Sequence, residues 1–191
     1  MENPQEWEDK LCTKESFAEA DLKRTTFRNC RFDGCDFTQA YLTNSKCIDC
    51  TWIRCNLSLV RWDGCRLQEA RFEECKIVGA NFSKCDPLFF SVAFKKCLLE
   101  TCNFSDIDLK GTSFAGSTLR ETHFSQVKLT HADFHDCTFK GGLFHHTDLT
   151  GANFLNASNF SIDPTTNILK KARFSKEEAV ALLSYLGILL E

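Results

Sequence analysis

The sequence predicts an all-β solenoid, a fold in which short strands wind into a stack of similar coils. The first observation is an apolar residue at every fifth position from Phe94 to Phe154, a period that fits neither a helix nor an ordinary strand. The second is that the same spacing runs through the first half, from Phe17 to Phe82. The third is that 14 of the 18 phenylalanines occupy these positions, which indicates an interior filled with rings.

We call these positions the centres of the repeat. They number 27, and all are apolar in a chain with 43% hydrophobic residues, which chance does not explain. Residues twenty apart carry similar side chains. If four five-residue units make one coil, each centre therefore stacks on a similar side chain in the next coil. The centres are Phe17, Leu22, Phe27, Phe32, Phe37, Leu42, Cys47, Trp52, Leu57, Trp62, Leu67, Phe72, Ile77, Phe82, Phe94, Leu99, Phe104, Leu109, Phe114, Leu119, Phe124, Leu129, Phe134, Phe139, Phe144, Leu149 and Phe154.

This pattern divides the chain into an N-terminal segment (1–14), a β-helix (15–160) and a C-terminal module (161–191). The spacing breaks near 83–93, where two extra residues and Pro87 interrupt it. Proline has no amide hydrogen for a ladder bond, so we expect a bulge there. We expect Phe89 to be the centre of the distorted unit. Phe90 then either points outward beside Leu88 as a contact site or packs beneath the bulge.

The chain has twelve cysteines, and the repeat accounts for their placement. Ten lie at or near the small inward position two before a centre, and Cys47 is itself a centre, so cysteine acts here as a compact apolar filler. The spacing of Cys30 and Cys35 is the repeat period and not the closer spacing typical of zinc ligands. We therefore expect reduced thiols, no disulfide and no metal.

Composition excludes several functional classes. The net charge is −3, with 23 basic and 26 acidic residues, which argues against direct binding of nucleic acid. No apolar run approaches the ~20 residues that span a bilayer, and the first ten residues lack the apolar core of a secretory signal. We expect a cytoplasmic protein without a membrane partner.

The sequence contains no motif for catalysis or for a cofactor. No glycine-rich phosphate loop, nucleophile with its base, or pair of carboxylates in a cleft is visible, and a filled solenoid offers no deep pocket. We therefore expect no enzymatic activity. The five histidines all fall on outward positions, and among them His145 and His146 with Asp148 are the only set that resembles metal ligands or a proton shuttle.

The C-terminal module changes character after Ala157. Ser175 and Glu178 have the spacing of a capping box, which predicts a helix from about Lys176 to Leu186 that ends at Gly187. One stripe of this helix should cover the open end of the last coil. It consists of Ala179, Leu182, Leu183 and Leu186. The remaining apolar residues need another cover, for which we expect a second copy of the chain. They are Val180, Ala181, Tyr185, Ile188, Leu189 and Leu190.

Several units, such as those around Leu22, Phe82 and Phe154, begin with Ala followed by Asp or Asn and resemble the motif of pentapeptide repeat proteins. This resemblance implies a right-handed quadrilateral β-helix with a C-terminal capping and dimerisation helix. The tail from Ile162 to Ile188 resembles that of the topoisomerase-protecting subgroup, the Qnr-type quinolone-resistance proteins with MfpA and McbG. That resemblance implies a homodimeric rod that mimics DNA and binds DNA gyrase or topoisomerase IV.

Three hypotheses of function remain at this point. The first is a DNA-mimicking topoisomerase modulator that gives quinolone resistance or self-immunity. The second is a non-enzymatic scaffold or interaction rod with another partner, and the third is a ligand- or metal-binding module that uses the surface histidines. A continuous acidic stripe on the folded surface would favour the first, and mixed charges with an exposed apolar patch would favour the second. The sequence assigns no face to a partner.

Overall fold

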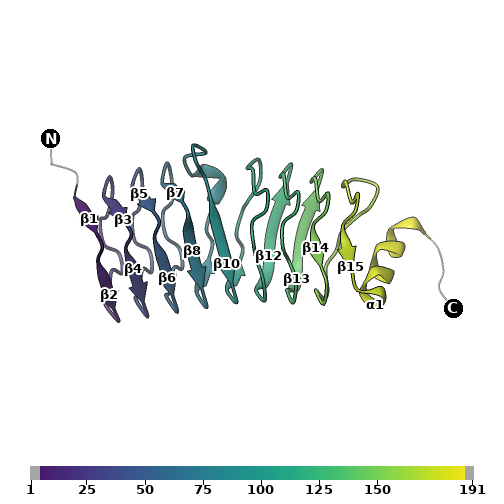
Figure 1. Cartoon of the computed structure of the whole chain (residues 1–191), viewed down its shortest axis with the longest axis horizontal. Coiled ribbons are helices and arrows are strands. Elements are labelled where there is room, and N and C mark those ends of the chain that lie inside the picture. The colour runs from purple at the N-terminus through teal and green to yellow at the C-terminus, as the bar shows by residue number, and fades with distance from the viewer. Residues whose placement is uncertain (1–4, 188–191) are drawn as a thin grey trace.

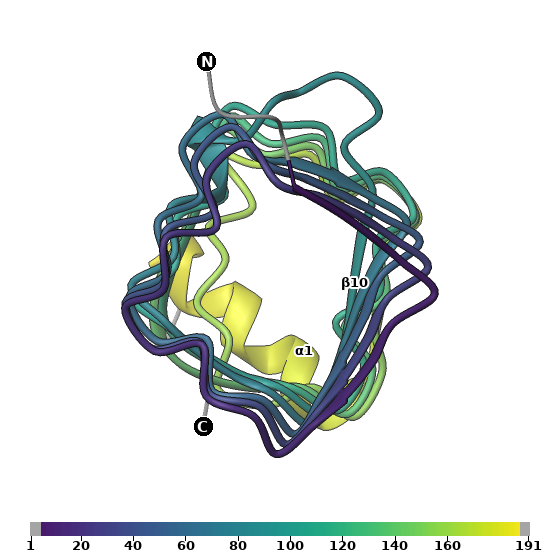
Figure 2. The same ribbon diagram turned by 90° about the vertical axis from the view of Figure 1, so that its left-hand side faces the viewer.

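A computed structural model describes residues 5–187 of the chain. The chain forms an elongated rod, with β1 at one end and α1 at the other (Figure 1). Viewed along the rod from the N-terminal end, successive turns overlay in a four-sided outline (Figure 2). The predicted all-β solenoid with a C-terminal helix is confirmed.

The strands are short because each occupies one side of a turn. They are β1 (Glu6–Glu8), β2 (Leu11–Thr13), β3 (Thr26–Arg28), β4 (Arg31–Asp33), β5 (Lys46–Ile48), β6 (Thr51–Ile53), β7 (Arg66–Gln68), β8 (Ala70–Glu73), β9 (Lys76–Val78), β10 (Val92–Lys95), β11 (Leu98–Glu100), β12 (Thr118–Ser125), β13 (Thr138–His145), β14 (Asn153–Phe154) and β15 (Arg173–Phe174). The helical segments are η1 (Phe82–Lys84), α1 (Lys176–Ala179) and η2 (Val180–Leu186).

Every pair of strands is parallel, and the register follows the repeat. The sheets have the orders β1-β3-β5-β7, β2-β4-β6-β8-β10, β9-β11-β12-β13 and β14-β15. Pairing between these strands joins residues twenty apart, as in Phe32 with Trp52, except across the insertion, where Phe72 pairs with Phe94. The side of the rod formed by β2, β4, β6, β8 and β10 continues through Phe114, Phe134, β14 and β15. We call this side the β2–β10 face.

The centres point inward and stack as columns along the rod. Phe124 lies between Phe104 and Phe144, with ring centroids 5.2 and 4.9 Å apart and ring planes within 9° of parallel. These distances are close to the ~4.8 Å between hydrogen-bonded strands. The rings and the backbone ladder therefore require the same spacing, and both are satisfied.

Positive φ angles turn the chain at the corners. The residue two places after a centre is in the left-handed region at nearly every corner, as at Asn29 (φ 50°), Asp49 (φ 54°) and Gly151 (φ 68°). Asparagine, aspartate and glycine tolerate this region better than other residues, which accounts for their frequency at these positions. The five-residue period is thus the length of one side plus its corner.

The β-helix begins earlier than residue 15. β1 and β2 lie within the segment 1–14 that the sequence analysis set apart, and they pair in register with β3 and β4. Trp7 packs on Phe27 with a centroid distance of 5.5 Å, and Cys12 is buried. Trp7 and Cys12 both lie on the five-residue spacing extended backwards from Phe17, and charged outward residues such as Glu6 and Glu8 flank Trp7.

The C-terminal helix lies across the last turn (Figure 2), but its capping box does not form. The Ser175 hydroxyl does not bond the helix; it accepts the Asn156 amide at 2.9 Å. Asn156 belongs to the preceding turn, and Ser175 directly follows β15, the strand that pairs with β14 of that turn. The Ser175 carbonyl meanwhile accepts the first helical bond, from Ala179 at 2.9 Å. Ser175 therefore joins the ladder to the helix, which ends at Gly187 in the left-handed region as predicted.

Replacing Phe124 by Ala tests the columns. It opens a cavity between two stacked rings and should lower the free energy of unfolding by ~3–5 kcal/mol, measured by urea denaturation. Phe89→Ala is the matched control, because Phe89 is 64% exposed while Phe124 is fully buried. The control should change the free energy by less than ~1 kcal/mol. Equal losses in the two variants would contradict the assignment of the interior.

Candidate interaction surfaces

A projecting loop, residues 86–91, lies between η1 and β10 and interrupts the regular outline (Figure 2). It contains the two-residue insertion. Pro87, Leu88 and Phe89 are exposed, and Leu88 and Phe89 expose 52% and 64% of their surfaces. Phe90 donates its amide to the Pro87 carbonyl at 3.4 Å, which closes a turn with Leu88 and Phe89 at its tip. We call this segment the apolar loop.

The structure contradicts the prediction for Phe89 and selects the packed alternative for Phe90. Phe89 is not the centre of the distorted unit; it projects from the rod. Phe90 is half-buried and packs against the core. The reason is the ladder: Ser91 must donate its amide to the Leu67 carbonyl, at 2.9 Å, and this places its neighbour Phe90 over the interior. Phe89 has φ 60°, a position in the turn that glycine ordinarily takes.

Both ends of the apolar loop are fixed by side chains. At the start, Asp86 accepts the Leu88 amide at 2.9 Å, and Arg66 donates to its Oδ2 from Nε and Nη2 at 3.0 and 2.8 Å. The Leu88 amide and then Arg66 hold the pKa of Asp86 below its usual value. At the end, the Ser91 hydroxyl donates to Glu69 at 2.9 Å. The loop is therefore held in place although its tip is exposed.

The outer surface carries charges of both signs, often paired between turns. Arg120 contacts Glu100 at 2.9 Å and Lys84 contacts Asp63 at 3.4 Å, and Arg54 pairs with Asp33 in the same way. These basic side chains interrupt the acidic ones along the rod. Such a surface has the mixed pattern expected of a general interaction rod, combined with an exposed apolar loop.

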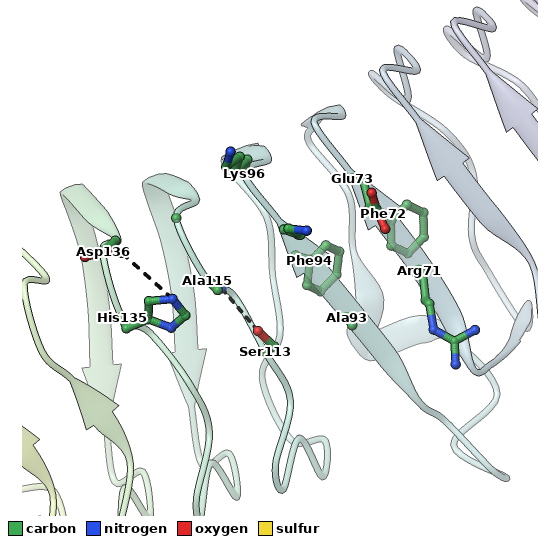
Figure 3. A pocket seen from close by; sticks show the side chains of 12 residues that line it. Arg71, Phe72, Glu73, Ala93, Phe94, Lys96, Ser113, Ala115, His135 and Asp136 are labelled. Carbon is green, nitrogen blue, oxygen red and sulfur yellow. Dashed lines mark hydrogen bonds and ion pairs between the residues drawn. The ribbon is translucent and has the colours of Figure 1, made fainter.

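A shallow trough of about 320 Å³ crosses the β2–β10 face (Figure 3). Its floor consists of the small outward side chains Ala93, Ser113 and Ala115 together with Gly116. Arg71 borders it on one side and His135 on the other (Figure 3). Sequence reasoning did not identify this feature, because small residues on neighbouring turns become a signal only once the turns have been aligned.

The C-terminal end presents a third apolar surface. Leu182 packs against the core, and Ala179 and Leu183 are half-buried, whereas Leu186 is 53% exposed and does not share their covered position. Leu186 therefore lies with the exposed residues, not in the cap. The expected interface residues Val180, Ala181 and Tyr185 are exposed, and Tyr185 bonds Ser161. The other three, Ile188, Leu189 and Leu190, lie outside the described residues.

The cysteines and histidines do not form a site in the described part of the chain. All twelve cysteines are free and buried. In residues 5–187 no three Cys, His, Asp or Glu side chains are grouped so as to hold a metal ion. His145 and His146 meet edge to face on the surface, with centroids 4.0 Å apart, and His135 contacts Asp133 at 2.7 Å. No helix in the same residues is long and apolar enough to cross a membrane.

A family model described as a pentapeptide repeat region matches residues 10–82 and 83–154. The chain belongs to the pentapeptide repeat family. Among curated protein sequences, none matches this pentapeptide repeat protein significantly.

Solved structures of other pentapeptide repeat proteins share the fold. One trypsin-treated variant of QnrB1, a plasmid-mediated fluoroquinolone resistance protein, has a TM-score of 0.66 at 21% identity and covers 97% of this chain and 89% of its own. A second such variant has 0.66 at 20% identity, with 98% and 92% covered. HetL, involved in heterocyst differentiation regulation in the cyanobacterium Nostoc, has 0.42 at 18% identity, with 88% and 86% covered. The likeness to the two QnrB1 structures, at 21% and 20% identity, shows the fold alone.

Thiol reactivity tests the interior of this pentapeptide repeat protein. Burial raises the pKa of Cys50, Cys102 and Cys137 from 9.0 to about 12. In the folded protein these pKa values lie above the value of 9.0 expected in the unfolded chain. The neutral thiols therefore make their full contribution to the free energy of unfolding below pH 9, and this contribution is lost as the pH rises towards 12. We expect thiol labelling of the folded protein at pH 8 to be slow, and all twelve thiols to be labelled after unfolding without reductant. Circular dichroism should show alkaline unfolding between pH 9 and pH 12. Recovery of eight or fewer thiols would indicate disulfides or bound metal.

Proposed function

We propose that this chain is a non-enzymatic interaction rod that binds and modulates a type II topoisomerase, DNA gyrase or topoisomerase IV. The observation that carries the proposal is the apolar loop: a rigid rod displays Leu88 and Phe89 to solvent on a loop fixed at both ends. Large apolar side chains exposed together on a fixed loop are typical of a binding site. The likeness to QnrB1 along nearly the whole chain supports this choice of partner.

Two mechanisms of binding are open to such a rod. In the first, the rod mimics DNA and its carboxylates take the place of phosphates, so affinity should fall steeply with salt. In the second, the apolar loop docks into the enzyme, and salt has little effect. The basic side chains paired with the acids along the rod favour loop docking. Either mechanism would inhibit the enzyme or relieve drug-poisoned cleavage complexes, and relief would give quinolone resistance or self-immunity.

A scaffold function with a different protein partner is the second candidate. The mixed surface charges and the apolar loop favour it, whereas the likeness to QnrB1 favours a topoisomerase. The two candidates differ only in the partner. An assay with purified topoisomerases therefore separates them.

Phe89→Gly tests the proposal. We expect the protein to inhibit supercoiling by gyrase or decatenation by topoisomerase IV at micromolar concentration, and Phe89→Gly to weaken binding at least about tenfold, as for a central contact residue. Because glycine suits φ 60°, the variant should unfold at no lower temperature than the parent. Supercoiling and cleavage assays with and without a fluoroquinolone, and binding by surface plasmon resonance at low and high salt, provide the readouts.

Leu59→Gly is the matched control, because Leu59 is also exposed and has φ 59° but lies on a regular corner. It should bind as the parent does. Loss of binding at high salt with no effect of Phe89→Gly would favour charge mimicry over loop docking. If neither enzyme binds the protein or responds to it at low salt, the scaffold function replaces the topoisomerase proposal.

We also propose that two copies pair through the C-terminal module. Val180, Tyr185 and Leu186 expose 46%, 40% and 53% of their surfaces beside the capped end, and a second copy is a natural cover for them.

The dimer is tested by changing exposed residues that do not contact the core. Val180→Glu combined with Leu186→Glu should give a folded monomer, because two buried like charges oppose the interface. Light scattering should show a dimer for the parent at micromolar concentration. Removal of residues 175–191 exposes the last turn as well and should give monomer or aggregate. A parent chain that is monomeric under these conditions would contradict the proposal.

A further inference from the structure

The apolar loop leaves bonds of the backbone ladder unmade on both of its sides. In the regular turns on this side of the rod, His131 donates its amide to the turn after it and Lys128 donates to the turn before it. Glu69 and Asp108 hold the corresponding positions next to the loop, but neither amide donates a backbone hydrogen bond among the described residues. In the same part of the chain, no backbone bond joins the loop to the following turn.

A different register of this segment would supply these bonds. The five-residue spacing favours Phe89 as the centre, because Phe89 lies five residues before the next centre. With Phe89 at the centre, the Phe90 carbonyl would occupy the position that accepts the Glu69 amide. The Pro87 carbonyl would occupy the position that accepts the Asp108 amide. The second register therefore completes the ladder that the loop interrupts.

Pro87 fits the inward position of this second register. The residue two places before a centre commonly donates its amide to the centre three residues earlier, as Cys65 does to the Trp62 carbonyl at 2.8 Å. Pro87 lies five residues after the preceding centre, Phe82, so an amide at position 87 would be too far along the chain for that bond. Proline has no amide hydrogen, so it loses no hydrogen bond in this position.

The register seen in the structure gains other contacts in exchange. Arg66 pairs with Asp86 at one end of the loop. Ser91 donates to Glu69 at the other end, and Phe90 packs against the core. One register thus has these side-chain contacts and the other has more ladder bonds. When two such states differ little in free energy, the minor one remains populated.

The thiol of Cys85 distinguishes the two registers. In the structure Cys85 is 6% exposed, and burial raises its pKa well above the usual value. In the second register Cys85 and Asp86 become the two extra residues at the corner, and Pro87 takes the inward place that Cys85 holds here. A buried thiol with a raised pKa is inert, whereas a thiol at an exposed corner is open to reagents.

We propose that residues 85–91 have a second register, in which Phe89 returns to the core, Phe90 turns outward and the projecting loop is withdrawn into the wall of the rod. A partner that binds the displayed Phe89 selects the register seen in the structure, and the second register withholds Phe89 from that partner. The proposal rests on the proposed function only for the identity of the partner.

The stabilities of Phe89→Gln, Phe90→Gln and the double variant test the proposal. In a rod with one register, the factors by which the single substitutions raise the unfolding constant multiply in the double variant. With two registers, Phe89 fills the core when Phe90 is replaced, so the unfolding constant of the double variant should exceed that product at least about tenfold. Glutamine adds no charge, so repulsion between neighbours does not imitate this effect. Urea denaturation that gives the simple product would overturn the proposal.

Thiol labelling of folded Phe90→Gln shows which register this variant adopts. We expect Cys85 to react at least about tenfold faster than in the parent, measured by mass spectrometry of the labelled peptides. Cys65, which is buried one turn earlier, is the matched control and should react as in the parent. Phe89→Gln should accelerate neither thiol. Unchanged labelling of Cys85 in Phe90→Gln, or equal acceleration of Cys85 and Cys65, would contradict a second register.

Binding provides a separate readout of the regulatory role. Phe90→Gln should weaken binding to the topoisomerase about tenfold or more, because it withdraws Phe89. If no topoisomerase binds the parent, the proposed function fails, while stability and labelling still decide between one register and two. Parental affinity in a Phe90→Gln variant whose Cys85 is reactive would overturn the regulatory role.

Discussion

Ring stacking at the spacing of the backbone ladder is the interaction on which the rod depends. In the column through Phe94, Phe114, Phe134, Phe154 and Phe174, successive centroids lie 5.3, 4.8, 4.9 and 5.0 Å apart. Side chains of other sizes are accommodated within a turn. Trp52 and Trp62 fill two sides of one turn, and the small Cys47 occupies another centre of the same turn. Both indole nitrogens are buried without a hydrogen-bond partner among the described residues, so packing outweighs their desolvation.

The sequence predicts the interior well because each inward residue is constrained by its neighbours twenty places away. It predicts the irregular places poorly. Phe89 lies five residues before the centre Phe94 and Phe90 only four, so the spacing favours Phe89. The bond from Ser91 to Leu67, which no spacing reveals, instead places Phe90 over the core. The capping box predicted at Ser175 is wrong for a similar reason. That motif is defined by neighbours in the sequence alone, whereas the Ser175 hydroxyl accepts the amide of Asn156 from the preceding turn.

The surfaces were less predictable than the core, since outward positions follow no period. The two-residue insertion also changes which residues are neighbours: Ala93 lies beside Arg71, twenty-two places earlier. A trough made by small residues on adjacent turns is therefore visible only after the break has been located. Trp7 and Cys12, in contrast, lie on the five-residue spacing when it is extended backwards from Phe17, so their place in the first turn was available from the sequence.

The anchoring of the apolar loop has a consequence for how such rods diversify. Arg66 with Asp86 and Glu69 with Ser91 close the loop at its two ends, and the bonds between turns resume at Ser91. Residues added between Leu88 and Phe89 would lengthen the loop without shifting the turns on either side. Natural variation, or an engineer, can thus change what is displayed at this corner while every other repeat keeps its partner. The rod then serves as a display scaffold whose specificity evolves separately from its stability.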